Sequence, residues 1–442
     1  MRIQLSDHFT YSKLLRFTAP SIIMMIFTSI YGVVDGIFVS NFVGKTPFAA
    51  LNLVYPVLMI LGAFGFMIGT GGTALVAKTL GQGRREVANQ YFSLMVYAAA
   101  LGGAAITLAG LLFLRPLAAA LGAEGEMLDY CVLYGRIILL ANPFFILQNV
   151  FQSFFVSAEK PKLGLLVTVG AGLTNIVMDA VLVAGLRLGL AGAAAATALS
   201  QAVGGLVPIL YFARPNSSLL RLTGTRFYGR VLVRACANGA SELMSNISAS
   251  LVNVLYNFQL MRLAGEDGVA AYGVIMYVAF IFAAIFIGYA VGGAPVISYH
   301  YGAEGREELR SLLRKSLVLT AAAGGAMTVL AVLAAEVLSR IFVGYDQALC
   351  EMTARGLRLF GVSFLFAGFN IFGSAFFTAL NNGLVSAAVS FLRTLVFQCA
   401  SVLLLPLFWD LDGVWLSVAA AEAMALAVTA ACLAANRKKY GY

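Results

Sequence analysis

The chain is an internal duplication, and this constrains its fold more than any single motif does. When the 442-residue sequence is shifted by 221 positions, half its length, it matches itself nearly without gaps. The coinciding pairs include Ala49/Ala270, Gly71/Gly292, Gly81/Gly302, Asn149/Asn370, Ser153/Ser374 and Gly192/Gly413. If each copy contains an even number of membrane spans, both copies enter the bilayer in the same direction and face each other. The repeat therefore predicts two similar lobes around a central cleft.

Composition identifies the surroundings of these lobes as a lipid bilayer. Hydrophobic residues make up 61% of the chain and charged residues 11%, and the mean hydropathy is +0.89. No soluble domain of this size could bury so much apolar surface. Apolar runs long enough to cross as helices lie at about 17–40, 47–76, 91–114, 131–157, 163–185, 190–213, 231–261, 269–298, 315–341, 355–379, 384–408 and 413–435. We therefore predict an all-α membrane protein of twelve transmembrane helices, arranged as two pseudo-symmetric six-helix lobes.

The distribution of basic residues predicts the orientation. If the N-terminus is cytoplasmic, the inner segments hold about 20 Lys and Arg and the outer loops about 6. This bias places both termini in the cytoplasm of a multi-pass protein, which we expect in the bacterial plasma (inner) membrane. The net charge of +9 follows from the bias and does not indicate nucleic-acid binding.

The longest basic inner connection lies where the two copies meet. It divides the chain into an amino-terminal lobe (1–213), a cytoplasmic inter-lobe linker (214–230) and a carboxy-terminal lobe (231–442). Motifs for nucleotide hydrolysis, metalloprotease or serine-hydrolase chemistry are absent from the sequence. The scattered cysteines and the separated His8 and His300 lack metal-ligand spacing. We therefore predict a non-enzymatic protein without cofactor or metal centre, with sodium at Asp35 and Asp179 as the alternative ion.

Acidic residues inside the predicted spans are the main candidate functional groups, because a charge in hydrocarbon is costly and usually faces a cavity, a partner or a proton path. Asp35 lies nine residues before the outer turn at Gly44, and Asp179 lies about ten before the turn at Gly189. At about 1.5 Å per residue the two acids reach the same level. The alternative is that each acid is paired or permanently protonated.

Two amides extend this acid pair into a line. Asn175 is one helical turn before Asp179, and Asn149 is as far from the turn at 160–162 as Asn175 is. We predict that Asp35, Asn149, Asn175 and Asp179 form a cation-coupling site. Two carboxylates in a partly dry pocket repel each other, so the pair can hold one proton or a monovalent cation at neutral pH. We expect H⁺ as the coupling ion, with Na⁺ bound at Asp35 and Asp179 as the alternative.

The second lobe does not repeat the acid pair, because Tyr256 and Ala400 stand at the corresponding positions. It contains instead Glu242 and Arg393 at similar depths in its first and fifth helices. We predict an ion pair between these two residues, with a structural or gating role. The alternative is that each is paired separately with amides or water. The role of Glu422, a further acid inside a span, stays open.

Proline and large apolar side chains complete the candidate site. Pro20 lies fifteen residues before Asp35 in the first span and can bend that helix. Aromatic residues and methionines on the early helices of both lobes would give adaptable walls for organic cations. These cleft candidates, which could equally lie in the core or face lipid, are Met24, Phe27, Tyr31, Tyr55, Met59, Tyr256, Met276, Tyr277 and Phe280.

Several of these segments together resemble a known family. The runs Leu14–Ser21, Tyr31–Val39, Ala49–Leu51, Gly69–Gly72 and Asn175–Asp179 are similar in order and spacing to those of multidrug and toxic compound extrusion (MATE) transporters. The resemblance covers essentially the whole chain.

The resemblance implies a V-shaped pair of lobes that exports cationic or amphipathic compounds in exchange for protons or sodium by alternating access. It also implies that Asp35, Asn149, Asn175 and Asp179 form the amino-lobe cation site and that Pro20 marks a helix bend. Some sodium-coupled members carry acids in helices seven and ten. Here Glu242 is present but Asn370 occupies the tenth span, which argues against a second sodium site.

The alternative within transport is a lipid-linked glycan flippase of the same superfamily. Such a protein would need several Lys or Arg in its cleft, and only Arg393 lies well inside a span. We expect the protein to work as a monomer whose partners are small organic cations or amphipathic drugs and the bilayer.

Overall fold

The computed structural model describes residues 3–442, and none of these residues forms a β-strand. The elements are α1 (Tyr11–Phe42), α2 (Lys45–Gly81), α3 (Arg85–Ala120), α4 (Gly125–Ser157), α5 (Pro161–Met178), η1 (Asp179–Gly185), α6 (Gly189–Ala213), α7 (Gly229–Gly302), α8 (Arg306–Val343), α9 (Gln347–Gly361), α10 (Phe364–Ala379), α11 (Gly383–Phe391), η2 (Leu392–Val396), α12 (Phe397–Leu404) and α13 (Pro406–Tyr440). The all-α membrane fold predicted from the sequence is confirmed.

The helices are long enough to cross a bilayer. Within residues 3–442, ten helices meet the length and hydropathy of a membrane span, and the pair α9–α10, bent by 47°, brings the number to eleven. α7 counts once although it has 74 residues, and its backbone is non-helical at Gly265 (φ 61°, ψ −148°). The stacking of Tyr256 on Tyr272, with ring centroids 5.3 Å apart, shows that the chain folds back at this break. If the two arms of α7 are counted separately, the layout is compatible with the twelve predicted spans.

Local sequence signals explain where several helices begin and end. The Thr10 side chain accepts a hydrogen bond from the Lys13 amide at the start of α1, and Asp346 caps α9 in the same way through Leu349. Gly83 and Glu304 are separated by 221 residues and both have positive φ, 75° and 57° respectively, in the turns that follow α2 and α7. The two copies therefore share turn geometry even where glycine is not kept.

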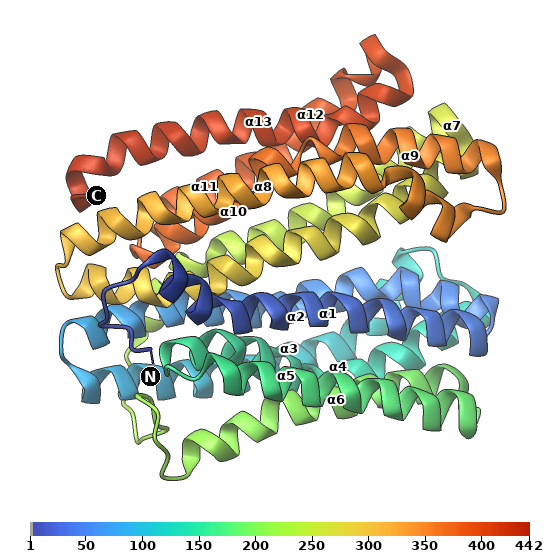
Figure 1. Cartoon of the computed structure of the whole chain (residues 1–442). Helices are drawn as coiled ribbons and strands as arrows, with labels where there is room; N and C mark the ends of the chain where they lie inside the picture. Colours follow the sequence, from blue (N-terminus) through green and yellow to red (C-terminus); the bar gives the residue numbers. More distant parts are fainter. Residues whose placement is uncertain (1–2) are drawn as a thin grey trace.

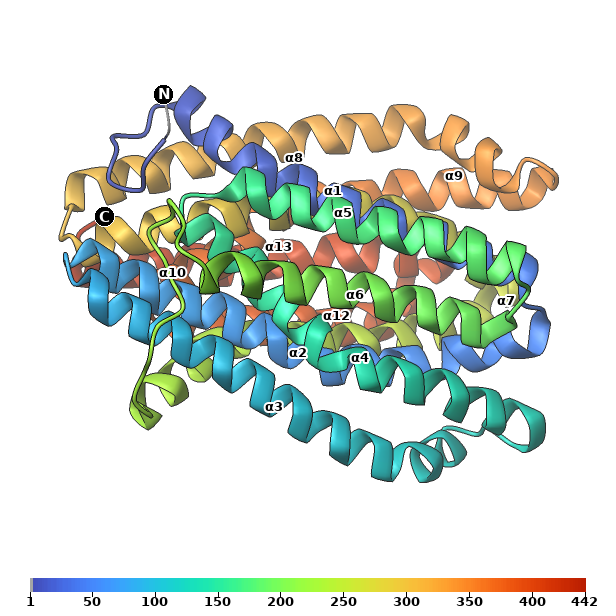
Figure 2. The ribbon, with the colours of Figure 1, turned by 90° about the horizontal axis from the view of Figure 1, so that it is seen from below.

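The two halves of the chain form two layers. Helices α1 to α6 lie together in one layer and α7 to α13 in the other (Figure 1), and both chain ends lie at the same end of the bundle (Figures 1 and 2). We call this the termini end. It is also where α2 and α7 finish and where α8 starts.

Glycines join the two layers near the termini end. A Cβ atom built on Gly71 would lie 1.9 Å from the carbonyl oxygen of Ala235, and one on Gly239 would lie 1.9 Å from that of Met67. Such distances are far inside van der Waals contact, so only glycine allows this approach of backbones. We call this contact, formed by Gly71, Gly81, Gly239, Gly288, Gly292 and Gly302, the inner seam.

The inner seam follows the symmetry of the repeat. Gly81 approaches the Tyr299 carbonyl from one side, and Gly302, its repeat equivalent, approaches the Lys78 carbonyl from the other, each with a would-be Cβ distance of 2.0 Å. Because these contacts are made by the last turns of α2 and α7, the lobes are closed against each other at the termini end.

The N-terminal strap, residues 3–10, adds a second connection between the lobes. The Leu5 amide donates to Glu159 Oε1 at 2.8 Å in the amino lobe, and the Phe9 amide donates to Glu308 Oε1 at 2.9 Å on α8. His8 also contacts Glu308, with Nδ1 2.6 Å from Oε2. Leu5 and Phe9 are fully buried, which anchors the strap across the closed end.

Candidate functional site

The four residues predicted to bind a cation lie on four elements of the amino lobe. Asp35 belongs to α1, Asn149 to α4 and Asn175 to the last turn of α5, while Asp179 begins the π-helical stretch η1. A π-helical turn shifts the register of the side chains that follow it and often occurs at functional sites. Helix α1 packs against both α5 and η1, which brings Asp35, Asn175 and Asp179 together, whereas Asn149 lies on α4, which packs against α5.

The carboxylates lie side by side, and Asp35 also interacts with Asn175. Asp179 is fully buried, Asn175 and Asn149 are nearly so, and Asp35 is half-buried. The two acids that the depth argument placed at one level are therefore brought together.

Hydrogen bonding at this site is incomplete. Asp35 Oδ1, both carboxylate oxygens of Asp179, Asn175 Oδ1 and Asn149 Nδ2 are buried atoms without a hydrogen-bond partner. Buried polar atoms are normally paired, and each unpaired one costs about 1–3 kcal/mol. These buried oxygens are suited to a proton or a small monovalent cation, which would neutralise their charge and act as their partner.

Aromatic and amide residues that the cation-site prediction did not include surround the acids. Tyr55 and Tyr134 lie within electrostatic range of Asp35, and Tyr134 also lies near Asp179. Tyr31 interacts with Gln148 on α4. Tyr31 and Tyr55 are among the predicted cleft residues, whereas Tyr134 and Gln148 are not predicted from the sequence. Gln148 precedes Asn149 directly, and that adjacency was the available sequence signal.

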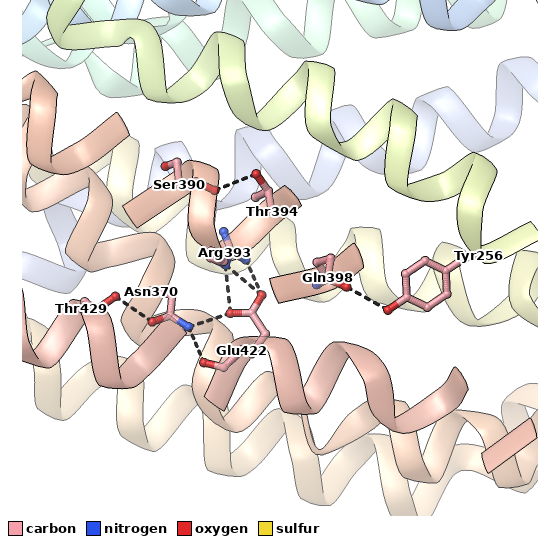
Figure 3. A network of polar contacts seen from close by, with 8 residues as sticks. All are labelled: Tyr256, Asn370, Ser390, Arg393, Thr394, Gln398, Glu422 and Thr429. Carbon is pink, nitrogen blue, oxygen red and sulfur yellow. Dashed lines mark hydrogen bonds and ion pairs between the residues drawn. The ribbon is translucent and has the colours of Figure 1, made fainter. Parts of the chain in front are cut away.

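The carboxy lobe contains a different arrangement, a closed polar network (Figure 3). Arg393 on η2 donates from Nε to both carboxylate oxygens of Glu422 at 2.9 Å, and its Nη2 lies 2.8 Å from Oε1. Asn370 Nδ2 donates to Glu422 Oε2 at 2.7 Å and to the Glu422 carbonyl at 2.8 Å. Thr429 Oγ1 completes the network by donating to Asn370 Oδ1 at 2.9 Å. Every charged group in this network has a partner.

This network corrects the predicted ion pair. Arg393 binds Glu422 and not Glu242, so the pairing predicted from depth is wrong. Glu242 lies on α7 within electrostatic range of Arg393 but does not form an ion pair with it. Depth along a helix fixes the level of a side chain but not the side of the helix from which it projects. Glu422 on α13 projects towards Arg393 and forms the ion pair with it.

The predicted cleft residues divide into buried and open positions. Met24 and Tyr256 are only 1% and 2% exposed, and the Tyr256 hydroxyl donates to Gln398 Oε1 at 2.8 Å inside the carboxy lobe (Figure 3). These two do not form an open wall in this conformation. Tyr55, Tyr277 and Phe280 are exposed.

The other candidates are half-buried, and two have packing partners. Phe27 and Tyr31 pack near Gly172 of α5, inside the amino lobe. Met59 and Met276 are partly buried. Pro20 lies within α1, which continues through it as one helix from Tyr11 to Phe42.

Comparisons with solved structures show the fold. A structure described as a crystal structure of MATE in complex with MaL6 superposes with a TM-score of 0.92 at 23% identity, over 98% of both chains. A structure described as the outward-facing conformation of a multidrug resistance MATE family transporter of the MOP superfamily gives 0.91 at 23% identity, again over 98% of both chains.

Sequence comparisons show the family. The chain is 27% identical over 378 residues to multidrug export protein MepA of Staphylococcus aureus (strain N315), covering 81% of this chain and 80% of that one. The corresponding protein of Staphylococcus haemolyticus (strain JCSC1435) is 26% identical over 368 residues, with the same coverage. The MatE family profile matches residues 20–181 and 243–402, once in each repeat. The chain therefore belongs to the MatE family, the multidrug and toxic compound extrusion transporters, and is not an enzyme.

Proposed function

We propose that the protein exports cationic or amphipathic organic compounds across the bacterial plasma membrane in exchange for protons. The observation that carries this proposal is the set of unpaired buried atoms on Asp35, Asn149, Asn175 and Asp179. Two buried carboxylates without a counter-charge need a proton or a cation to neutralise them, and a coupling site must bind and release that ion. Similarity to proteins named multidrug export protein MepA supports the substrate class.

Alternating access is consistent with the arrangement of the lobes. The positive-inside bias assigns the termini end to the cytoplasm, and the inner seam closes that end. The conformation is thus one in which the cleft opens away from the cytoplasm. Export then requires the seam and the N-terminal strap to separate, which we assign to the inward-facing step of a monomeric transporter.

Protonation offers a route for coupling. Charged Asp35 and Asp179 repel each other and disfavour close packing of α1 against η1, whereas a shared proton removes that repulsion. Binding of the proton from outside and its release inside would therefore change the packing between α1 and the rest of the amino lobe. Sodium bound by the same carboxylate oxygens is the alternative coupling ion. We assign Tyr55, Tyr277 and Phe280, the exposed aromatic candidates, to apolar surface available to substrate.

The flippase alternative is not favoured by the carboxy lobe. Pyrophosphate recognition requires free cationic side chains in the cleft. Arg393 is bound by Glu422 and is therefore not free to take such a ligand.

The proposal is tested in proteoliposomes with the chain inserted in one orientation and ethidium as the organic cation. In sodium-free buffer, a pH gradient that is acid on the outer side should drive ethidium out of the cytoplasmic side, with protons moving in the opposite direction. Strict dependence on sodium without response to the pH gradient would replace the coupling ion but keep the acid site. Absence of transport under both gradients would reject the proposed antiport.

A further inference from the structure

A basic and apolar groove lies on the carboxy lobe at the termini end, far from the acid site. Its volume is about 510 Å³, and it is formed by α8 and the end of α13. Arg310, Arg314 and Arg437 line it together with Leu313, Leu317 and Leu433. All three arginines are exposed, and within residues 3–442 no carboxylate forms an ion pair with them.

The duplication shows what occupies the equivalent groove of the amino lobe. The 221-residue shift places Asn89, Ser93 and Asn216 at the positions of Arg310, Arg314 and Arg437. Asn89 Oδ1 accepts a hydrogen bond from the Arg221 amide at 3.0 Å, and Ser93 Oγ accepts one from the Thr223 amide at 2.8 Å. These bonds hold the inter-lobe linker in place.

The linker also fills the apolar part of that groove. Leu220 is fully buried in the same cluster as Phe92 and Phe212. Phe212 is the repeat equivalent of Leu433, and its carbonyl accepts from the Leu222 amide at 3.0 Å. In the carboxy lobe the Leu433 carbonyl is satisfied by the Tyr442 hydroxyl, also at 3.0 Å. Tyr442 covers one end, and the rest of the carboxy-lobe groove is uncovered.

The order of residues along α8 indicates the chemistry of a ligand that would fit this groove. The helix begins at Arg306, so Arg310 and Arg314 lie about 6 and 12 Å from its start. Leu317, Val318 and Ala321 follow, deeper in the bilayer. Charge at the membrane surface and apolar surface below it match the headgroup and acyl chains of a phospholipid. An acidic peptide would meet the arginines but would leave the deeper apolar wall uncovered.

We propose that this groove binds one anionic phospholipid of the inner leaflet, with its phosphate held by Arg310, Arg314 and Arg437. Guanidinium groups bind phosphate oxygens through paired hydrogen bonds, and basic pockets between membrane helices on the cytoplasmic side bind anionic headgroups. The lipid takes the place that the linker takes in the amino lobe. The choice of leaflet rests on the cytoplasmic orientation given under Proposed function, whereas the groove itself does not depend on ion coupling.

Native mass spectrometry of the purified full-length chain tests this site. The probes are phosphatidylglycerol, phosphatidylcholine with matched acyl chains, and inorganic phosphate. We expect one phosphatidylglycerol to be retained in preference to phosphatidylcholine, and no retention of phosphate. Each Arg near a membrane surface contributes about a fivefold gain in affinity, so R310Q/R314Q/R437Q should weaken phosphatidylglycerol binding on the order of 100-fold.

A matched control removes three charges elsewhere on the same face. Lys162, Arg226 and Arg230 are exposed and do not line the groove. K162Q/R226Q/R230Q should therefore bind phosphatidylglycerol as the wild type does. If the groove triple variant does not purify as a monodisperse species, R310Q, R314Q and R437Q are measured singly, each with an expected loss of about fivefold.

Three results would overturn the proposal. The first is unchanged phosphatidylglycerol affinity in the groove variants. The second is equal retention of phosphatidylcholine, which would show that the headgroup charge is irrelevant. The third is a bound peptide or retained inorganic phosphate in place of lipid. Failure of ion-driven transport in the antiport assay would leave this binding result unaffected, so the two proposals fail independently.

Discussion

The fifth segment of each lobe contains a π-helical stretch with one charged residue. Asp179 begins η1 in the amino lobe, and Arg393 lies in η2 in the carboxy lobe. Glu422 neutralises the charge of Arg393 and also accepts a hydrogen bond from Asn370 (Figure 3). Around Asp179 the charged neighbour is a second acid, Asp35, and neither Asp179 oxygen has a hydrogen-bond partner.

This difference assigns unlike roles to two copies of one unit. A buried ion pair with complete hydrogen bonding needs no exchangeable partner and holds its helices in one register. Two neighbouring carboxylates without a counter-charge are stable only with a proton or a cation between them. We therefore propose ion coupling as the role of the amino lobe and helix positioning as the role of the Arg393–Glu422 network.

The largest expected effect comes from the acid pair. Asp35→Asn or Asp179→Asn should reduce gradient-driven ethidium efflux to background, because a side-chain amide neither takes up nor releases a proton near neutral pH. Removing one of two like charges also removes their repulsion, so the apparent melting temperature in detergent should stay equal or rise. Efflux and melting are measured on the same preparations.

Retention of wild-type efflux in both variants would break the comparison between the lobes. A lowered melting temperature together with a loss of efflux would show instead that the acids stabilise the lobe. The carboxy-lobe variants described next serve as the contrast, since they should lose stability first.

The second prediction concerns the carboxy-lobe ion pair. Glu422→Gln or Arg393→Gln alone leaves a charge without its partner, which costs about 3–5 kcal/mol when the site is buried. The double variant R393Q/E422Q should be more stable than either single variant. A double-mutant cycle on chemical or thermal unfolding measures this coupling.

Glu242→Gln is the matched control for the ion pair. Glu242 lies near Arg393 without forming an ion pair, so its neutralisation should change stability less than Glu422→Gln does. Additive effects of Arg393 and Glu422, or a stronger effect of Glu242, would contradict the observed pairing.

The general fold could be predicted from the sequence because its signals extend over the whole chain. Hydropathy marks the membrane spans, and the 221-residue repeat makes two lobes that enter in one direction. Hydropathy also separates the predicted spans 231–261 and 269–298, and the reversal inside α7 at Gly265 falls between them. What these signals do not contain is the rotation of each helix about its axis.

That missing rotation explains the errors at the site. Asp35 and Asp179 were placed correctly because they lie at one level on helices that pack directly, and Asn175 lies one turn from Asp179. Glu242 and Arg393 also lie at one level, but Glu422 on a third helix faces Arg393. Tyr256 was assigned to the cleft for its aromatic character, yet its ring stacks on Tyr272 within the lobe. Each of these outcomes depends on packing between helices distant in sequence.

The smallest of the three expected effects comes from the inner seam, where both lobes use glycines to allow close contact of their backbones. Gly239→Ala places a Cβ against the Met67 carbonyl, a backbone atom that has no rotamer by which to move away. Overpacking of this kind costs about 1–3 kcal/mol and should push the lobes apart at the termini end. Gly293→Ala is the control. Gly293 also lies on α7, and a Cβ added there would meet no atom within 4 Å.

Labelling of a cysteine placed in the seam reads out this separation. Ser21 is 1% exposed, and its carbonyl lies against Gly288. In a Ser21→Cys background we expect Gly239→Ala to raise the rate of labelling by a membrane-impermeant maleimide from the termini side. The expected gain is about 5- to 150-fold if the whole overpacking free energy shifts the equilibrium towards the open seam. Gly293→Ala should leave the rate unchanged. Equal labelling of the two variants would mean that the seam does not hold the lobes closed, and that the closed end depends on the N-terminal strap alone.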